Sequence, residues 1–150
     1  MKAGPERELA DRYAKRLAPV ARPLGVDWRG VTELPEARDA STDARRESEA
    51  EAILSRAEPG TCLVALDEHG RQPNSSEFAD LLARFRDDGA PSLALAIGGP
   101  DGHGRSLLER ADATIAFGRL TWPHQIVRVL ALEQLYRAAT ILAGHPYHRS

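Results

Sequence analysis

The chain has 150 residues, of which 42% are hydrophobic and 28% are charged, and its formal net charge is -2. This length predicts one domain spanning residues 1–150 and excludes two independently folding domains. The nearly balanced charge excludes a protein that binds nucleic acid over its whole surface.

The cysteine and charge patterns predict a cytoplasmic protein. Cys62, the single cysteine, excludes an intrachain disulfide and lies in an apolar run, where a thiol packs as a small hydrophobic group. The charged N-terminal segment lacks the apolar stretch of a signal peptide. The longest apolar run, residues 126–142, is interrupted by the charged side chains of Arg128, Glu133 and Arg137. It therefore does not predict a membrane span.

The first predicted element is an amphipathic helix. Pro5 marks its start, because proline's fixed φ and missing N–H are harmless in a first turn. Leu9, Tyr13 and Leu17 recur at every fourth residue and form its apolar stripe, which ends before Pro19.

The next segment carries weaker signals. Residues 26–31 predict a short strand, and residues 34–41 predict a loop. A charged helix with a thin apolar face follows, capped by Thr42 or Asp43 and running to about Glu58.

Residues 61–66 form a continuous apolar run, as expected for a strand that is covered on both faces. Residues 67–73 predict a loop. Asn74 and Glu77 have capping-box spacing and begin a helix. The predicted buried face of that helix consists of Phe78, Leu81, Leu82 and Phe85.

The last third alternates again between strands and helices. Strands are predicted at 92–97 and 113–117, with a helix at 105–110 between them and a long helix at the end. This alternation predicts an α/β fold with a mostly parallel sheet.

The final predicted helix is apolar nearly all round, which indicates burial on more than one side. In a chain this small the sheet covers one side, so a second copy of the chain is the economical cover for the other. We therefore expect a homodimer, with a helix sandwiched within the monomer as the alternative.

A glycine-rich turn, residues 98–104, follows the strand at 92–97. It resembles a phosphate-binding loop except that Arg105 replaces the lysine, and the acidic strand ending at Asp67 precedes it rather than following it. The glycine spacing also differs from a dinucleotide-binding fingerprint. The remaining interpretations are a plain tight turn or a ligand-binding turn outside the carboxyl end of a strand.

The end of the chain is basic. From Arg119 onward four arginines face one carboxylate, Glu133, and three histidines accompany them. A local basic surface on a nearly neutral protein suits a site that touches phosphate groups at one face, although solvated arginines are the alternative.

Metal binding and cysteine catalysis have little support in the sequence. His145 and His148 lack a third ligand with suitable spacing, so no metal is expected. Cys62 lacks an electropositive neighbour that would make it a nucleophile. His69 and His103 lie in predicted loops and are expected to be exposed.

Four segments together resemble one known family: Ile97-Gly-Gly-Pro, Leu120-Thr-Trp-Pro-His-Gln-Ile-Val-Arg, Glu133-Gln-Leu-Tyr-Arg-Ala and Tyr147-His-Arg. They resemble the RlmH family of SPOUT-class methyltransferases, which methylate ring nitrogen 3 of a pseudouridine in large-subunit (23S) ribosomal RNA. The resemblance is dense over residues 63–150 and looser over residues 6–58.

The resemblance implies a homodimer with S-adenosyl-L-methionine as cofactor and assembled ribosomes as substrate. It also implies a mostly parallel sheet flanked by helices and a C-terminal trefoil knot, an exception to the rule against threaded chains. The implied cofactor-binding residues are Leu66, Gly98, Phe117, Gly118, Arg119, Leu120, Thr121 and Trp122.

The beginning of the chain departs from the family pattern. Family members start with a short apolar strand, whereas residues 1–4 lead straight into Pro5. We expect the first strand to be missing, either because the start lies inside a longer reading frame or because the strand is lost. Its loss would leave a sheet edge uncovered.

Methyl transfer to the pseudouridine nitrogen requires loss of a proton and stabilisation of the resulting anion. His148 is the candidate base or orienting group, and Arg149 and Arg128 are the candidate charge stabilisers. Tyr147 is expected to stack on the target base. His124 has an equally good interpretation as a local capping or packing group.

The basic tail is expected to reach across the dimer and complete the partner's pocket. The alternative function is a non-catalytic, dimeric ribosome-binding or assembly factor with the same fold. Such a factor has no reason to keep a cofactor pocket, so binding of S-adenosylmethionine distinguishes the two.

Overall fold

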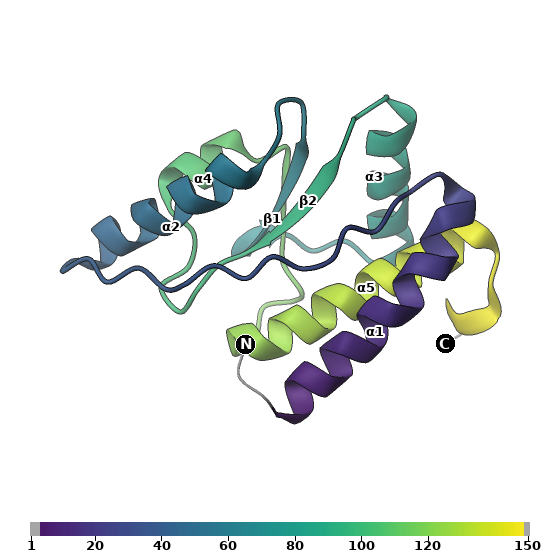
Figure 1. The fold of residues 1–150 in the computed structure, drawn as a ribbon, viewed down its shortest axis with the longest axis horizontal. Coiled ribbons are helices and arrows are strands. Elements are labelled where there is room, and N and C mark those ends of the chain that lie inside the picture. Colours follow the sequence, from purple (N-terminus) through teal and green to yellow (C-terminus); the bar gives the residue numbers. More distant parts are fainter. Residues whose placement is uncertain (1–3, 149–150) are drawn as a thin grey trace. The chain divides into compact units, whose positions relative to one another are not determined.

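A computed structural model of the chain describes residues 4–148, and it divides into two compact units (Figure 1). The first, called here the helical unit, contains the described residues up to Thr32, Asn74–Arg84 and those from Gln125 onward. The second, called the sheet unit, contains Glu33–Pro73 and Phe85–His124.

The first helix of the helical unit, α1 (Pro5–Ala21), begins at the predicted proline but continues through Pro19. The predicted end before Pro19 was wrong because the proline lies near the end of the helix, where little of the hydrogen-bond ladder follows it. A 3-10 turn, η1 (Arg22–Leu24), then leads to Gly25, whose φ of 79° ends the helical path.

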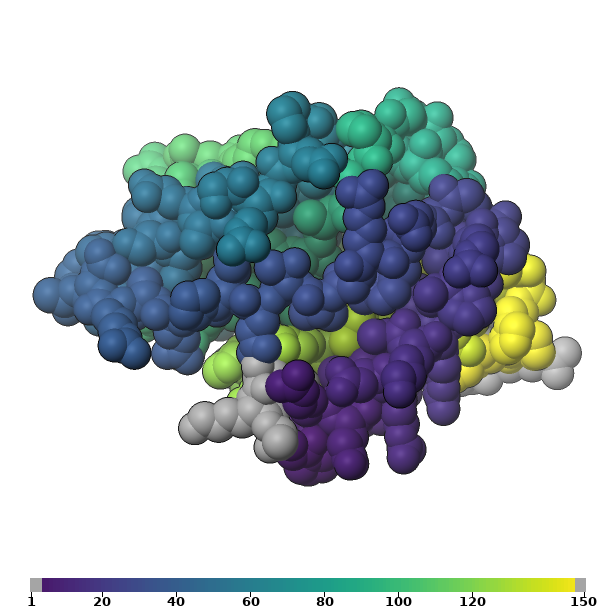
Figure 2. Space-filling view, viewed as in Figure 1, coloured from purple at the N-terminus to yellow at the C-terminus, as the bar shows by residue number. Residues whose placement is uncertain are grey.

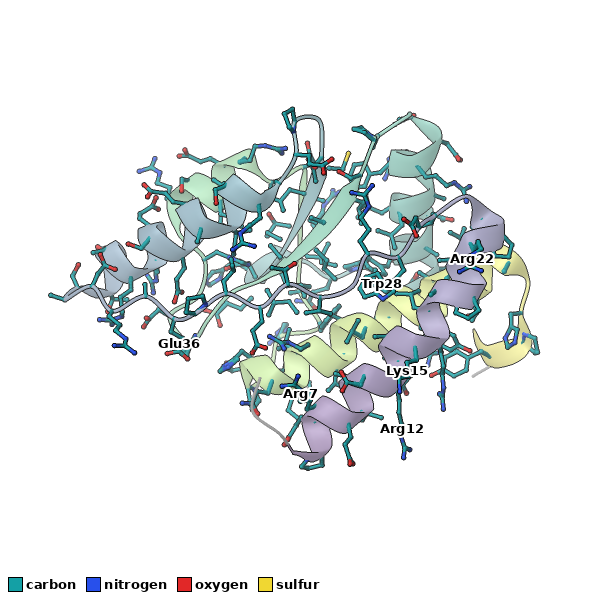
Figure 3. The ribbon with its side chains drawn as sticks, in the orientation of Figure 1. Arg7, Arg12, Lys15, Arg22, Trp28 and Glu36 are labelled. Carbon is teal, nitrogen blue, oxygen red and sulfur yellow. The ribbon has the colours of Figure 1, made fainter. Side chains whose placement is uncertain are left out.

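The predicted strand at 26–31 is wrong, because this segment has no strand partner and runs as irregular backbone. Val26 and Val31 are exposed. Trp28 packs instead against both apolar clusters of the helical unit, beside Leu17 of α1 and Leu132 of the last helix (Figure 3). Trp28 is therefore a packed apolar residue as expected, but it packs against helices and not within a sheet.

The last helix, α5 (His124–Ala143), packs along α1. Ala10 meets Val129 in one cluster, and Ala21 meets Ala139 in the other, so small side chains let the two helices approach closely. Four other apolar side chains of α5 remain half-exposed: Ile126, Val127, Leu130 and Ile141. The homodimer that would cover them stays a prediction.

The helix α3 (Ser75–Asp87) has the predicted capping box. The Glu77 N–H donates to Asn74 Oδ1 over 2.8 Å, and the Asn74 N–H donates to Glu77 Oε1 over 2.9 Å. The pair thus satisfies two backbone donors reciprocally. Of the predicted apolar face, Phe78 is buried and the other three side chains are half-buried.

The sheet unit contains a three-stranded parallel sheet in the order β2-β1-β3, which confirms the predicted α/β class. The strands are β1 (Cys62–Arg71), β2 (Leu93–Ile97) and β3 (Ala113–Ile115). The central strand carries the four consecutive buried residues expected from its continuous apolar run: Leu63, Val64, Ala65 and Leu66.

Two helices cover this sheet, α2 (Thr42–Arg56) and α4 (Arg105–Arg110). Their apolar side chains form one core with the strands, comprising Ala50, Leu63, Ala65, Ala96 and Leu107. The bounds of α4 agree with the prediction. The cap of α2 is Ser41, whose hydroxyl accepts from the Ala44 N–H over 3.1 Å, and not Thr42 or Asp43.

The central strand β1 is longer than predicted, because it continues through the predicted loop to Arg71. Its pairing with β3 is irregular between Leu66 and Arg71, both of which lie opposite Ile115. The Ala116 N–H donates to the Arg71 carbonyl over 2.7 Å. Such an irregularity adds residues to one strand only, and no local sequence pattern signals it.

Gly70 makes this extension possible. A Cβ at this position would lie 2.7 Å from the backbone of Thr114 and Ile115. We expect Gly70→Ala to lower the free energy of unfolding by about 1–3 kcal/mol, because β1 and β3 would have to separate. Chemical denaturation measures this loss. Glu68→Ala, at an exposed position of the same strand, controls for substitution in β1 as such. Equal losses in both variants would contradict the close approach.

The predicted trefoil knot stays a prediction. Met1 to Ala3, which belong to the segment where the family's first strand was expected to be missing, lie outside the described residues.

Candidate functional site

The residues predicted to bind the cofactor all lie in the sheet unit, after the carboxyl ends of β2 and β3 and at the matching level of the longer strand β1. Leu66 is paired with Ile97 at the last position of the β1–β2 ladder and with Ile115 of β3. Gly98 directly follows β2, and residues 117–122 begin two positions after β3. Because the strands are parallel, these three segments meet at one edge of the sheet.

The glycine-rich turn at 98–104 folds back on itself at this edge. The Gly102 N–H donates to the Gly99 carbonyl over 3.0 Å, and Gly102 has a φ of 86°. A Cβ on Gly98 would lie 3.1 Å from the Gly102 carbonyl carbon and 3.3 Å from the His103 nitrogen. Gly98 is therefore held in close backbone contact by the rest of its own turn.

The charged helix α2 holds the turn from outside, a role that the sequence did not reveal. Arg45 Nε donates to the Asp101 carboxylate over 2.8 Å, and Arg46 Nε donates to the Asp101 carbonyl over 2.6 Å. The hydrogen bond from Arg45 lowers the pKa of Asp101. A Cβ on Gly104 would lie 2.6 Å from the Arg46 carbonyl oxygen, so only glycine allows this approach.

The segment before α2 is attached to the same helix. Arg45 Nη1 also donates to the Asp39 carbonyl over 3.1 Å, and the Ala37 N–H donates to the Glu49 carboxylate over 2.9 Å. In the space-filling view of Figure 2, the segment before α2 and α2 itself belong to the part of the surface coloured blue. The helix with the thinnest apolar face in the chain thus organises two loops through its charged face.

His103 is buried, which corrects the expectation that it is exposed. Only 8% of the residue is accessible, and its Nε2 lies 3.2 Å from the Ala96 carbonyl. Burial lowers the pKa of His103, while hydrogen bonding to the Ala96 and Leu66 carbonyls and the charges of Asp67 and Glu49 oppose the shift. His69, in contrast, has a side chain that is 84% exposed, as expected.

The burial of His103 predicts a loss of stability in acid. In the unfolded chain the His103 imidazole takes up a proton near pH 6.5, whereas in the folded chain its pKa is lower. The free energy of unfolding therefore contains this contribution in full above pH 6.5. It decreases as the pH falls from 6.5 toward the pKa of the folded state. Denaturation at pH 7.5 and 5.5 should show wild type losing up to about 1.4 kcal/mol more than His103→Gln. Equal losses in both proteins would contradict the neutral, buried imidazole.

The loop after β3 places apolar groups beside exposed backbone. Trp122 Nε1 donates to the Phe117 carbonyl over 3.2 Å and closes the loop, and Gly118 adopts a φ of 96°. Leu120 is 70% exposed and Trp122 is 40% exposed. Large apolar side chains with this exposure at the edge of a sheet indicate a surface that a ligand or a partner covers.

These residues fit a nucleoside-type cofactor such as S-adenosylmethionine. A Cβ on Gly118 would meet nothing within 4 Å, so backbone groups are open to a ligand there. Apolar groups of Leu120 and Trp122 suit a base or a thioether stem, and residues 117–122 carry no carboxylate.

Of the predicted catalytic residues, Tyr147 lies in the helical unit within an aromatic cluster. Its ring contacts Tyr136 with centroids 4.6 Å apart, and its hydroxyl donates to the Tyr13 hydroxyl over 3.4 Å. The Arg137 guanidinium lies 5.3 Å from the ring centroid. Burial, together with the Tyr13 hydrogen bond, raises the pKa of Tyr147 to about 12, so the phenol stays protonated at neutral pH.

The other catalytic candidates differ in how they are placed. Arg128 is half-buried on α5, and burial together with the charge of Arg7 lowers its pKa. His124 is exposed at the first residue of α5. The side chain of His148 and all of Arg149 lie outside the described part of the chain.

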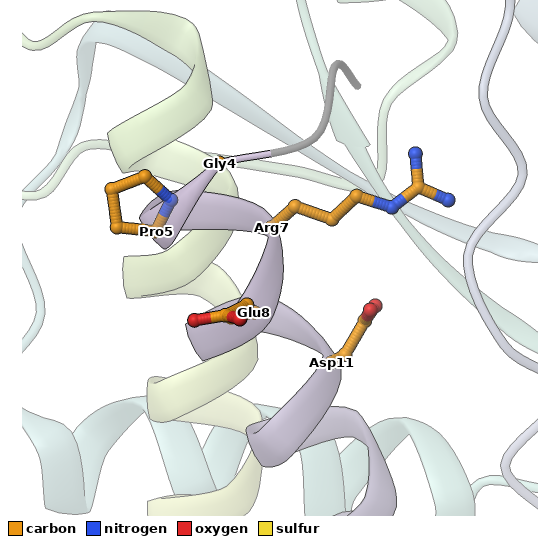
Figure 4. A pocket seen from close by; sticks show the side chains of 5 residues that line it. All are labelled: Gly4, Pro5, Arg7, Glu8 and Asp11. Carbon is orange, nitrogen blue, oxygen red and sulfur yellow. The ribbon is translucent and has the colours of Figure 1, made fainter.

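A surface hollow lies at the first turns of α1, and it contains none of the predicted site residues. Figure 4 shows its lining, with Arg7 and Asp11 extending on one side of the helix and Glu8 on the other. Its charges are mixed in sign, so it does not favour an anion.

Three further findings bear on the nature of the site. Within residues 4–148, no three histidine, cysteine or acidic side chains are grouped so as to hold a metal ion. None of the helices described combines the length and hydropathy required of a transmembrane segment. Cys62 is half-buried, and burial raises the pKa of its thiol.

Comparison with known proteins decides which family has this arrangement. The family described as "Predicted SPOUT methyltransferase" matches residues 1–148. A protein of Brucella anthropi named ribosomal RNA large subunit methyltransferase H is 55% identical over 150 residues, covering 100% of this chain and 94% of the relative. The chain belongs to the RlmH family of SPOUT methyltransferases.

Other RlmH relatives give the same picture. Proteins of that name from Brucella abortus strain S19 and Brucella melitensis biotype 1 are 52% and 51% identical, and each alignment covers 100% of this chain and 94% of the relative. Membership of the RlmH family confirms the resemblance found in the sequence. The site residues themselves stay predictions, supported by their convergence at the edge of the sheet.

Proposed function

We propose that this chain is an S-adenosylmethionine-dependent methyltransferase that modifies ring nitrogen 3 of a pseudouridine in 23S ribosomal RNA. The observation that carries the proposal is the meeting of Leu66, Gly98 and residues 117–122 at one sheet edge, in a chain of the SPOUT methyltransferase family. The name shared by its relatives supports ribosomal RNA as the substrate.

The cofactor, when bound, supplies an activated methyl group on a sulfonium. In the proposed reaction the protein has to align this methyl group with the acceptor nitrogen, and the transfer requires no metal. The backbone at Leu66, Gly98 and Gly118 would hold the nucleoside, while Leu120 and Trp122 would cover its apolar parts and exclude water.

On the acceptor side, we assign proton removal to the terminal residues. A neutral His148 imidazole takes the N3 proton of the pseudouridine, directly or through a water molecule. Arg149 and Arg128 stabilise the negative charge that develops on the base. The Tyr147 ring stacks on that base, which requires it to leave its contacts with Tyr136 and Tyr13.

The proposed assembly is a cytoplasmic homodimer in which the tail of one copy completes the pocket of the other. The half-exposed apolar side chains of α5 support a second copy as the cover of this helix. The assembled ribosome is the proposed substrate, and the dimer itself would read it.

Calorimetry with S-adenosylmethionine and mass spectrometry of ribosomal RNA test the proposal together. We expect saturable cofactor binding by the purified protein. In a strain lacking the gene, we expect loss of one methyl group on a 23S pseudouridine and its return on complementation. A protein that binds ribosomes but no cofactor would instead be the non-catalytic assembly factor.

A further inference from the structure

The His103 imidazole lies at the end of β2, beside the glycine-rich turn that carries it. It is the only buried one of the four histidines whose side chains the structure describes. Its Nε2 is 3.2 Å from the Ala96 carbonyl of β2. A side chain of the glycine-rich turn is therefore hydrogen-bonded to the strand that leads directly into Gly98.

The turn is held on its other side by α2, through the two hydrogen bonds to Asp101 from Arg45 and Arg46. His103 supplies the attachment that faces the sheet. The backbone at His103 lies 3.3 Å from where a Cβ of Gly98 would be, so a shift of His103 is transmitted directly to Gly98. Removing the imidazole leaves the turn attached to α2 but removes its side-chain hydrogen bond to β2.

We infer that His103 is a positioning residue for the methyl donor, because its hydrogen bond to the Ala96 carbonyl fixes the glycine-rich turn, and with it the Gly98 backbone, at the end of β2. The inference rests on the proposed function. A neutral imidazole has a single N–H, and the geometry uses Nε2–H as donor to the Ala96 carbonyl. The role therefore requires a hydrogen-bond donor of this reach and requires no charge.

His103→Leu and His103→Gln separate a donor requirement from simple filling of space. We expect His103→Leu to raise the dissociation constant for S-adenosylmethionine about 5- to 20-fold in calorimetry, the range for a lost buried hydrogen bond. The glutamine amide can place its nitrogen where Nε2 lies, so His103→Gln should stay within about threefold of wild type. In both variants the KM for ribosomes should be unchanged.

Two variants control for stability and for removal of a histidine as such. Ile53→Ala loses a side chain that packs on the core of the sheet unit and that lies seven positions after Arg46 on α2. It should lower the melting temperature but leave the cofactor dissociation constant unchanged. His69→Leu, at the exposed histidine, should change neither quantity.

The outcomes are distinguishable. The inference is wrong if His103→Leu binds the cofactor as tightly as wild type, if His103→Gln binds no better than His103→Leu, or if Ile53→Ala weakens binding equally. A wild-type protein that binds no S-adenosylmethionine overturns the proposed function itself, and the inference with it.

Discussion

Removal of residues Tyr147–Ser150 is expected to lower the turnover number for ribosomal RNA methylation about 100-fold or more, with cofactor affinity within a few-fold of wild type. The truncation takes away the proposed base, one charge stabiliser and the proposed stacking ring. It leaves every residue of the sheet unit in place. Methyl incorporation into ribosomes and calorimetry with S-adenosylmethionine measure the two quantities separately.

Truncation also removes the packing of Tyr147 on Tyr136, so stability needs its own control. His148→Asn keeps the aromatic contact and should lose most of the activity without a change in melting temperature. Mixing the truncated chain with a Gly98→Val chain tests whether the tail acts across the dimer, because mixed dimers then regain one complete site. A truncated enzyme with full activity would show that the tail assignment is wrong.

Gly98→Val should weaken S-adenosylmethionine binding about 10- to 100-fold, and methylation should fall in parallel at limiting cofactor. The added Cβ would lie 3.1 Å from the Gly102 carbonyl carbon, so the turn would have to move away from the strand end. Isothermal titration calorimetry gives the affinity directly.

Pro100→Ala is the matched control, because Pro100 is exposed in the same turn. It should leave the affinity unchanged, and thermal unfolding of both variants shows whether the protein remains folded. If Gly98→Val bound S-adenosylmethionine as tightly as wild type, the assignment of Gly98 to the cofactor site would be wrong.

Several features of the fold were predictable because the signals that specify them are local. A capping box, Asn74 to Glu77, involves two neighbouring residues and was confirmed by its two hydrogen bonds. The continuous apolar run at 61–66 and the alternation with helices led to a parallel sheet, whose carboxyl edge collects the loops that follow its strands. This edge and the family resemblance together pointed to Leu66 and Gly98, whose role as cofactor contacts stays a prediction.

Other features depended on contacts between distant segments. The predicted strand at 26–31 was wrong because Trp28 packs on α1 and α5, and a strand forms only where a neighbouring strand is free to pair. The extension of β1 to Arg71 required β3 to lie against Gly70, more than 40 positions away in the chain. The residues next to Trp28 or Gly70 in the sequence do not reveal which distant segment each of them contacts.

By itself the sequence determined the α/β class, most helices and strands, and the family, and it predicted where a cofactor would bind. These follow from apolar periodicity, capping residues and short motifs, which act within a few residues of one another. Tertiary structure alone decided that His103 is buried at the strand ends and that Arg45 and Arg46 hold Asp101. Burial and ion pairing depend on which segments meet in space, and a flexible glycine-rich turn gives no local signal of where its side chains will lie.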